Sequence, residues 1–185
     1  LDLKGKPKLA GVFYASRTDL DSYVYFSIPL ASFPWKAGRS TGNAVSRLKR
    51  VGLATGRLVV NLAPVIAVSP DVLRRADPLV VNEHEGSLAL RMLGEHAHGD
   101  HAVVAALVDS GVPGVVMTRG AKGALVGRPG RTTTVSSPEV DVVDTTGAGD
   151  AFVGALATRL LAGDDLADAA AFAARVGAFA CTGRG

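Results

Sequence analysis

A glycine-rich turn that ends in a carboxylate is the segment of this sequence best suited to chemistry. It spans residues 144–150 and reads Asp-Thr-Thr-Gly-Ala-Gly-Asp. The small and apolar side chains that follow recur at helical spacing without proline, which predicts a helix over Ala148–Leu161. Gly147 and Gly149 are then expected at the helix entrance, where missing Cβ atoms let backbone N–H groups approach an anion and the helix dipole favours negative charge. The turn therefore predicts a site that holds a phosphoryl group.

Asp150 does not fit a simple phosphate cradle, because its carboxylate repels the phosphate. A carboxylate at this place suits a general base that takes a proton from an attacking hydroxyl. The alternative is structural, with an aspartate that caps the helix and glycines that turn the chain. The sequence contains neither a Gly-x-x-x-x-Gly-Lys-[Ser/Thr] P-loop nor the Gly-x-Gly-x-x-Gly motif of dinucleotide-binding proteins.

The longer string over residues 144–152 resembles the C-terminal signature of the ribokinase-like (PfkB) carbohydrate kinases. The resemblance implies that Asp150 deprotonates a primary hydroxyl of a sugar as this oxygen attacks the γ-phosphorus of ATP. It also implies that the N–H groups of Gly147, Ala148 and Gly149 stabilise charge on the transferring group. The expected activity is that of an ATP-dependent sugar kinase, a phosphotransferase with an alcohol acceptor, with ribose favoured.

Three other segments resemble the same family, in the family's order. Residues 80–85 look like its Asn-x-x-Glu motif, which implies that Asn82 and Glu85 bind the nucleotide and that Glu85 organises Mg²⁺ through water. Residues 115–124 resemble the strand and turn that border the nucleotide. Residues 61–64 look like the Asn-Pro-Ala-Pro strand end of the ribokinases, with leucine in place of the first proline.

The resemblance also implies further nucleotide ligands and a monovalent cation. Nucleotide contacts are expected from Thr118, Gly120, Gly123 and Thr145. In relatives that use potassium, the ion lies beside the anion hole, and Asp144 and Thr146 are the matching positions. The implied cofactors are ATP and Mg²⁺, with K⁺ as a further candidate.

The first third of the chain carries fewer matches, and they belong to the family's sugar site. Gly38 and Asn43 match a Gly-Gly-x-x-x-Asn segment that binds sugar, although Arg39 stands where the second glycine is expected. Asp19 and Asp21 are alternative matches to an aspartate that binds sugar hydroxyls. The residues expected to bind the sugar are Gly38, Asn43, Asp19 and Asp150.

The sequence is shorter than ribokinase-like proteins in two places. Four residues separate Gly56 from Asn61, where ribokinase-like proteins have several strand and helix units and part of a lid. The sequence also stops at Gly185, where relatives continue through a loop and a last helix. We expect a protein with a large internal deletion and a clipped C-terminus, or a sequence from which segments are missing. The alternative function is a catalytically defective remnant that binds nucleotide or a partner without turnover.

Alternating apolar strands and helical patterns around these motifs predict an α/β fold. Strands are expected over residues 9–14, 23–28, 58–61, 79–81, 115–118 and 140–144. Helices are expected over residues 44–51, 83–93, 102–110 and 148–161. The expected architecture is ribokinase-like, a mostly parallel doubly wound sheet flanked by helices, with a small antiparallel edge of three short strands between residues 115 and 135. The chain is expected to be a single domain, with 1–57 as a partial sugar-binding and lid portion and 58–185 as the nucleotide-binding and catalytic portion.

Composition argues against several classes of function. The chain has 185 residues, 48% of them apolar, which is enough for one core. Its one cysteine, Cys181, excludes an internal disulfide framework and fits a reducing compartment. The formal charge of +3, without an interleaved aromatic pattern, argues against nucleic acid as a partner, and the apolar runs are too short for a membrane span. No secretory signal begins the sequence, so we expect a cytoplasmic protein. Sheet edges left open by a deletion predict a homo-oligomer.

Overall fold

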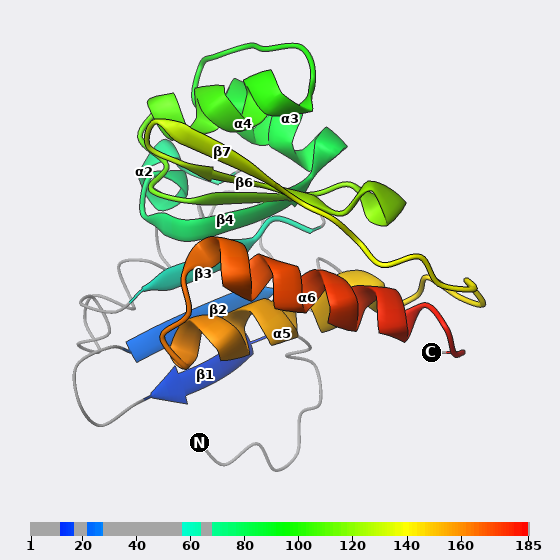
Figure 1. Ribbon diagram of the computed structural model, residues 1–185. Coiled ribbons are helices and arrows are strands. Elements are labelled where there is room, and N and C mark those ends of the chain that lie inside the picture. The colour runs from blue at the N-terminus through cyan, green and yellow to red at the C-terminus, as the bar shows by residue number, and fades with distance from the viewer. Residues whose placement is uncertain (1–11, 17–21, 28–56, 64–67, 185) are drawn as a thin grey trace, which may run out of the picture.

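A mixed β-sheet lies at the centre of the computed structural model, which describes residues 12–16, 22–27, 57–63 and 68–184 (Figure 1). Within these residues the sheet has seven strands in the order of the sequence. They are β1 (Val12–Ser16), β2 (Ser22–Ser27), β3 (Leu58–Asn61), β4 (Ala76–Asn82), β5 (Val115–Thr118), β6 (Ala124–Arg128) and β7 (Arg131–Val135). The pairs β2/β3, β3/β4 and β4/β5 are parallel, whereas β1/β2, β5/β6 and β6/β7 are antiparallel.

The predicted α/β class and the antiparallel edge are confirmed. The three short strands expected between residues 115 and 135 are β5, β6 and β7, and they form two antiparallel pairs at one side of the sheet. The strands expected over 23–28, 58–61 and 79–81 overlap β2, β3 and β4. The strand expected over 9–14 overlaps β1 from Val12 onward, and its first residues lie outside the described part of the chain, as does the helix expected over 44–51.

Helices cover both faces of this sheet, so the doubly wound architecture is also confirmed (Figure 1). The α-helices are α2 (Pro70–Leu73), α3 (Glu83–Met92), α4 (Asp100–Asp109), α5 (Ala148–Leu161) and α6 (Leu166–Ala180), and a short 3₁₀ turn, η3, spans Gly120–Lys122. The expected helix over 148–161 has the bounds of α5, and those over 83–93 and 102–110 overlap α3 and α4. No helix among the described residues is long and apolar enough to cross a bilayer.

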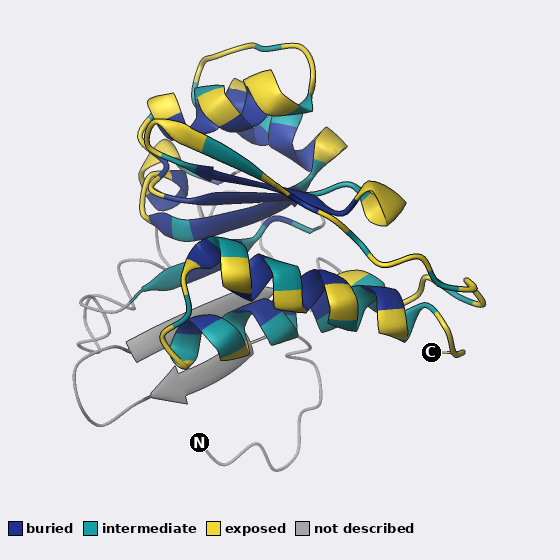
Figure 2. Ribbon diagram, viewed as in Figure 1, coloured by how far each residue is buried: buried dark blue, intermediate teal, exposed yellow. Residues whose placement is uncertain are grey.

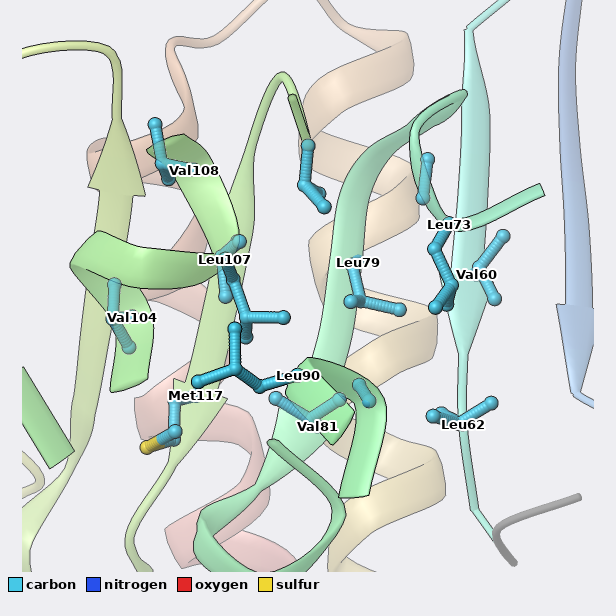
Figure 3. Close-up of a cluster of buried hydrophobic side chains, with 14 of the residues drawn as sticks. Val60, Leu62, Leu73, Leu79, Val81, Leu90, Val104, Leu107, Val108 and Met117 are labelled. Atoms are coloured by element: carbon cyan, nitrogen blue, oxygen red, sulfur yellow. The ribbon is translucent and has the colours of Figure 1, made fainter. Parts of the chain in front are cut away.

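Successive strand residues point to opposite faces and meet different helices. On one face, Leu79, Val81 and Met117 pack with side chains of α2, α3 and α4, as Figure 3 shows. On the other face, Val80 and Val116 pack with side chains of α5 and α6. The buried central strands and the exposed outer sides of the helices are visible in Figure 2. The near-continuous apolar runs of the central strands follow from this double burial.

The predicted strand that ends at Asp144 is wrong. Residues 136–147 form a connection without strand pairing, and Val142 and Val143 are 62% and 58% exposed. The N–H groups of Val143 and Asp144 instead donate to the carbonyl of Cys181, at 2.8 and 3.2 Å. Valine pairs favour extended backbone locally, but the preference of a segment for a strand depends on a neighbouring strand to pair with. Here the end of α6 takes the place of that neighbour.

The structure predicts different losses of stability for two alanine substitutions, one at a buried and one at an exposed side chain. Leu79→Ala removes a side chain with 0% exposure between the sheet and the α3/α4 layer, which should lower the free energy of unfolding by about 2–5 kcal/mol. Val143→Ala removes an exposed side chain and should change it by less than about 0.5 kcal/mol. Urea unfolding followed by circular dichroism measures both. Equal effects of the two substitutions would contradict the burial described here.

Candidate functional site

A cleft of about 870 Å³ lies where four segments of the chain meet. They are the end of β5 with the turn after it, the connection over 137–142, the first turn of α5 and the last turns of α6. All four lie on the right-hand side of Figure 1. The cleft is therefore assembled from segments that are far apart in the sequence.

The cleft gathers many of the residues that the sequence singled out. Its walls include the predicted residues Thr118, Gly120, Gly123, Thr145, Ala148 and Gly149. Gly147 and Asp150 flank the last two of these in the chain but do not line the cleft, and Asp150 is exposed. Asp144, Thr146, Asn82 and Glu85 are also absent from its walls. The predicted phosphate turn and the predicted nucleotide loop therefore meet in one place, with the remaining predicted residues around it.

The turn before α5 presents unused backbone donors. Gly147 has φ +77°, a left-handed conformation that glycine adopts without strain. The N–H of Ala148 donates to the carbonyl of Thr145 at 3.2 Å, whereas Gly149 and Asp150 are in the first turn, where N–H groups have no intrahelical acceptor. A Cβ on Gly149 would meet no described protein atom within 4 Å. The start of α5 can thus admit an anion against its N–H groups.

Asp144 shapes the beginning of this turn. Its Oδ1 accepts a hydrogen bond from the N–H of Thr146 at 2.9 Å, and its own N–H donates to Cys181. These contacts fix the turn between the last residues of α6 and the first residues of α5. A hydrogen bond from the backbone of Thr146 to the side chain of Asp144 therefore joins the two residues predicted to hold potassium.

The turn between β5 and β6 forms the opposite wall. Gly120 and Gly123 have φ of +57° and +81°, and a Cβ on Gly123 would lie 2.0 Å from the carbonyl oxygen of Val135. The N–H of Arg119 donates to the carbonyl of Gly123 at 2.8 Å and closes the turn. Glycine at position 123 is therefore required by packing, whereas Gly120 has open space around its Cα.

Asn82 and Glu85 form a capping box at the start of α3. The N–H of Asn82 donates to Oε2 of Glu85 at 2.7 Å, and the N–H of Glu85 donates to Oδ1 of Asn82 at 2.8 Å. Burial raises the pKa of Glu85, and the hydrogen bond from Asn82 and the nearby His84 oppose this rise. The sequence interpretation missed this structural role, although Asn-x-x-Glu before a helical pattern has the spacing of a capping box.

The same two residues lie beside the cleft through the sheet register. Asn82 pairs with Thr118 across β4 and β5, and the hydroxyl of Thr118 donates to the carbonyl of Val81 at 3.4 Å. Both residues are at the carboxyl ends of parallel strands, where ligands of α/β proteins bind. Oε1 of Glu85 takes no part in the capping box, so its carboxylate keeps an oxygen of the kind that Mg²⁺ prefers. Among the described residues no group of three or more His, Cys, Asp or Glu side chains is arranged to hold a metal directly.

Most of the remaining described lining residues are apolar or acidic. Apolar and small residues come from Pro138, Val140, Val142, Phe152, Ala174, Gly177, Ala178 and Cys181. Sequence reasoning missed the α6 members because a run of alanines is typical of core packing, and the half-buried Cys181 also lies at the cleft. Glu139 and Asp141 are acidic members of the lining, and none of the described lining residues is a lysine, arginine or histidine. Attraction for an anion therefore comes from the backbone at the start of α5 and not from basic side chains of the lining.

Most of the residues predicted to bind the sugar lie outside the described part of the chain. Gly38, Asn43 and Asp19, together with Asp21 and Arg39, lie outside the described residues. Asp150 is the member of that predicted set that the structure describes.

The sequence and the fold both match sugar kinases. A ribokinase from Schizosaccharomyces pombe is 34% identical over 132 residues, which cover 69% of this chain and 42% of that protein. A crystal structure of ribokinase from Thermotoga maritima superposes with a TM-score of 0.65 at 28% identity, covering 76% of this chain and 47% of that one. A fructokinase double mutant from Vibrio cholerae, in a form with fructose, ADP and potassium bound, gives a TM-score of 0.62 at 31% identity over 78% and 49% of the two chains.

These matches cover most of this chain but only part of each relative. The chain spans less than half the length of the curated ribokinase it matches, so the whole protein's activity does not follow from likeness alone. The family model described as "pfkB family carbohydrate kinase" matches residues 23–185, which are most of the chain. The chain therefore belongs to the pfkB family of carbohydrate kinases.

Proposed function

We propose that this chain carries the nucleotide-binding and catalytic portion of an ATP-dependent sugar kinase. The observation that supports this most is the cleft, where the glycine turn before α5 faces the turn after β5 across a space of about 870 Å³. Apolar walls from Val140 and Ala178 suit a flat base, and the N-terminus of α5 suits a phosphate. A cleft with one apolar end and one anion-binding end fits a nucleotide better than it fits an uncharged ligand.

Asp150 is the proposed general base. Its carboxylate would accept the proton of a primary sugar hydroxyl while the oxygen attacks the γ-phosphorus of ATP, so the O–P bond forms as the bond to the ADP oxygen breaks. The N–H groups of Gly147, Ala148 and Gly149 would stabilise the charge on the transferring group, that of Ala148 after release from the carbonyl of Thr145. The products are ADP and a sugar phosphate.

Metal ions would support the phosphates. Asn82 and Glu85 are proposed to hold Mg²⁺ through water, and this ion would supply neutralising charge to the phosphate oxygens when bound. Potassium is proposed beside Asp144 and Thr146. The fructokinase with potassium bound shares this fold, and both residues lie in the turn before α5. Thr118, Gly120, Gly123 and Thr145 are the proposed nucleotide contacts.

The sugar site and the assembly are proposed from the sequence. Ribose is the favoured substrate, with Gly38, Asn43 and Asp19 as its ligands in a partial portion over residues 1–57, and 58–185 is proposed as the nucleotide-binding and catalytic portion. We also propose a homo-oligomer in the cytoplasm. A screen of sugar-dependent ADP release over ribose, fructose, fructose 6-phosphate and adenosine tests the substrate. ATP binding without turnover on any acceptor would favour the alternative, a catalytically defective relative.

Asp150→Asn is predicted to remove the chemical step and spare nucleotide binding. The amide keeps the shape of the side chain but cannot accept the proton, so sugar-dependent turnover should fall by about 10²- to 10⁴-fold, or roughly 3 to 5 kcal/mol of barrier. ATP affinity should be equal or slightly higher, because a negative charge near the γ-phosphate is removed. Steady-state kinetics and calorimetric ATP titration measure the two effects. Undiminished sugar phosphorylation would exclude Asp150 as the base.

Gly149→Val is predicted to damage binding and turnover together. A valine side chain would occupy the space in front of the first-turn N–H groups, so ATP affinity should fall by about 10- to 100-fold. Gly154→Val is the matched control, since Gly154 lies in the same helix and its Cβ would also meet no described atom within 4 Å. Equal losses in the two variants would indicate a general effect of valine on α5 and not a blocked phosphate site.

Potassium is predicted to activate the protein. If an ion binds beside Asp144 and Thr146, replacing sodium by potassium should raise turnover or ATP affinity severalfold, because the cation adds positive charge beside the anion-binding turn. Rates are compared in the two chloride salts at matched ionic strength. Equal rates and equal affinities in both salts would remove the monovalent ion from the mechanism.

A further inference from the structure

Arg119 is a charged side chain beside the cleft that the proposed reaction does not use. It lies between Thr118 and Gly120, both of which line the cleft, but Arg119 itself does not line it. Its side chain is 12% exposed. A guanidinium is thus held behind the wall of the cleft and not inside it.

The guanidinium reaches two different elements. Nη2 donates to the carbonyl oxygen of Lys122 at 3.3 Å, across the turn that carries Gly120 and Gly123. Nη1 lies 3.8 Å from Oδ2 of Asp100, the first residue of α4. The planar fork of arginine can donate to the carbonyl of Lys122 with one nitrogen and form an ion pair with Asp100 through the other, a geometry that a lysine ammonium does not offer. The turn is therefore tied to α4 through one side chain.

One nitrogen of the Arg119 guanidinium has no partner that the structure describes. Nε of Arg119 is buried and makes no hydrogen bond among the described residues. An unpaired buried donor costs free energy, which the contacts of this side chain with Lys122 and Asp100 must offset. Groups that break a rule of stability are commonly found where function requires them.

We propose that Arg119 is a positioning residue for the nucleotide, which holds the 119–123 turn in its binding conformation through Lys122 and Asp100. The inference rests on the proposed function of the cleft. The turn contains Gly120 and Gly123 at positive φ, and glycines of this kind leave many conformations accessible when they are not restrained. Fixing the turn before the nucleotide arrives removes an ordering cost from binding.

Calorimetric titration of the full 185-residue chain with ATP tests the proposal. Arg119→Met, which keeps the apolar stem, should raise the Kd for ATP by about 3- to 10-fold, the effect of losing about one hydrogen bond. Arg119→Lys should lose nearly as much, because it keeps the charge but not the fork. With ATP at saturation, kcat and the sugar KM should stay within about twofold of the parent, since a positioning effect acts on nucleotide affinity.

Arg128→Met is the matched control. Arg128 also contacts a carboxylate and a carbonyl, those of Asp77 and Pro113, but it lies at the end of β6 away from Thr118. This variant should lose stability without a change in ATP affinity. Asp100→Asn is a second variant for the case in which Arg119→Met does not fold, because the Asp100 side chain is more exposed. This variant should weaken ATP binding by about twofold.

Each contrary result has a distinct meaning. Full ATP affinity in Arg119→Lys, or tighter binding in Asp100→Asn, would mean that Arg119 acts through charge and would overturn the positioning role. Unchanged affinity in Arg119→Met would overturn it as well. A parent protein that binds no nucleotide would overturn the proposed function and this inference with it, whereas a parent that binds ATP isolates the failure to Arg119.

Discussion

The anchoring of α5 on the sheet is the constraint on which the rest of the site depends. Phe152, Val153 and Leu156 are buried against the face that Val80 and Val116 present, so the helix cannot rotate or slide without exposing them. Its first turn is thereby held at the cleft, and the unused N–H groups of that turn become a fixed anion site. Hydrophobic packing of α5 on the sheet therefore places the N–H groups of its first turn at the cleft.

The carboxyl ends of the parallel strands supply the second part of the site. The register that pairs Asn82 with Thr118 places a part-buried capping box beside the wall of the cleft. The carbonyl of Cys181 then secures the connection over 143–144 to the end of α6. Backbone hydrogen bonds thus hold the connection over 143–144, and the bond from the Arg119 N–H to the Gly123 carbonyl closes the turn after β5.

Sequence reasoning succeeded where local pattern and tertiary structure agree. Small and apolar residues at helical spacing predicted the bounds of α5, and the glycine turns between Val115 and Val135 predicted β5, β6 and β7. It failed over residues 140–144, because a strand exists only where a neighbour pairs with it, and this segment pairs with the end of a helix. It also missed Ala174 and Ala178 as cleft residues, since small side chains carry no chemical signal in a sequence. The parts of the site that it found are those built on glycine and carboxylate, whose roles depend on the local backbone.

Hydrogen–deuterium exchange with and without ADP tests the central claim, that this cleft is a nucleotide site. The structure predicts slower exchange in three segments, the 118–123 turn, the connection from 137 into the first turn of α5, and the last turns of α6, because these segments form the walls of the cleft. The α3/α4 layer on the other face of the sheet should exchange at an unchanged rate. Protection confined to that layer, or no protection at saturating ADP, would contradict the account.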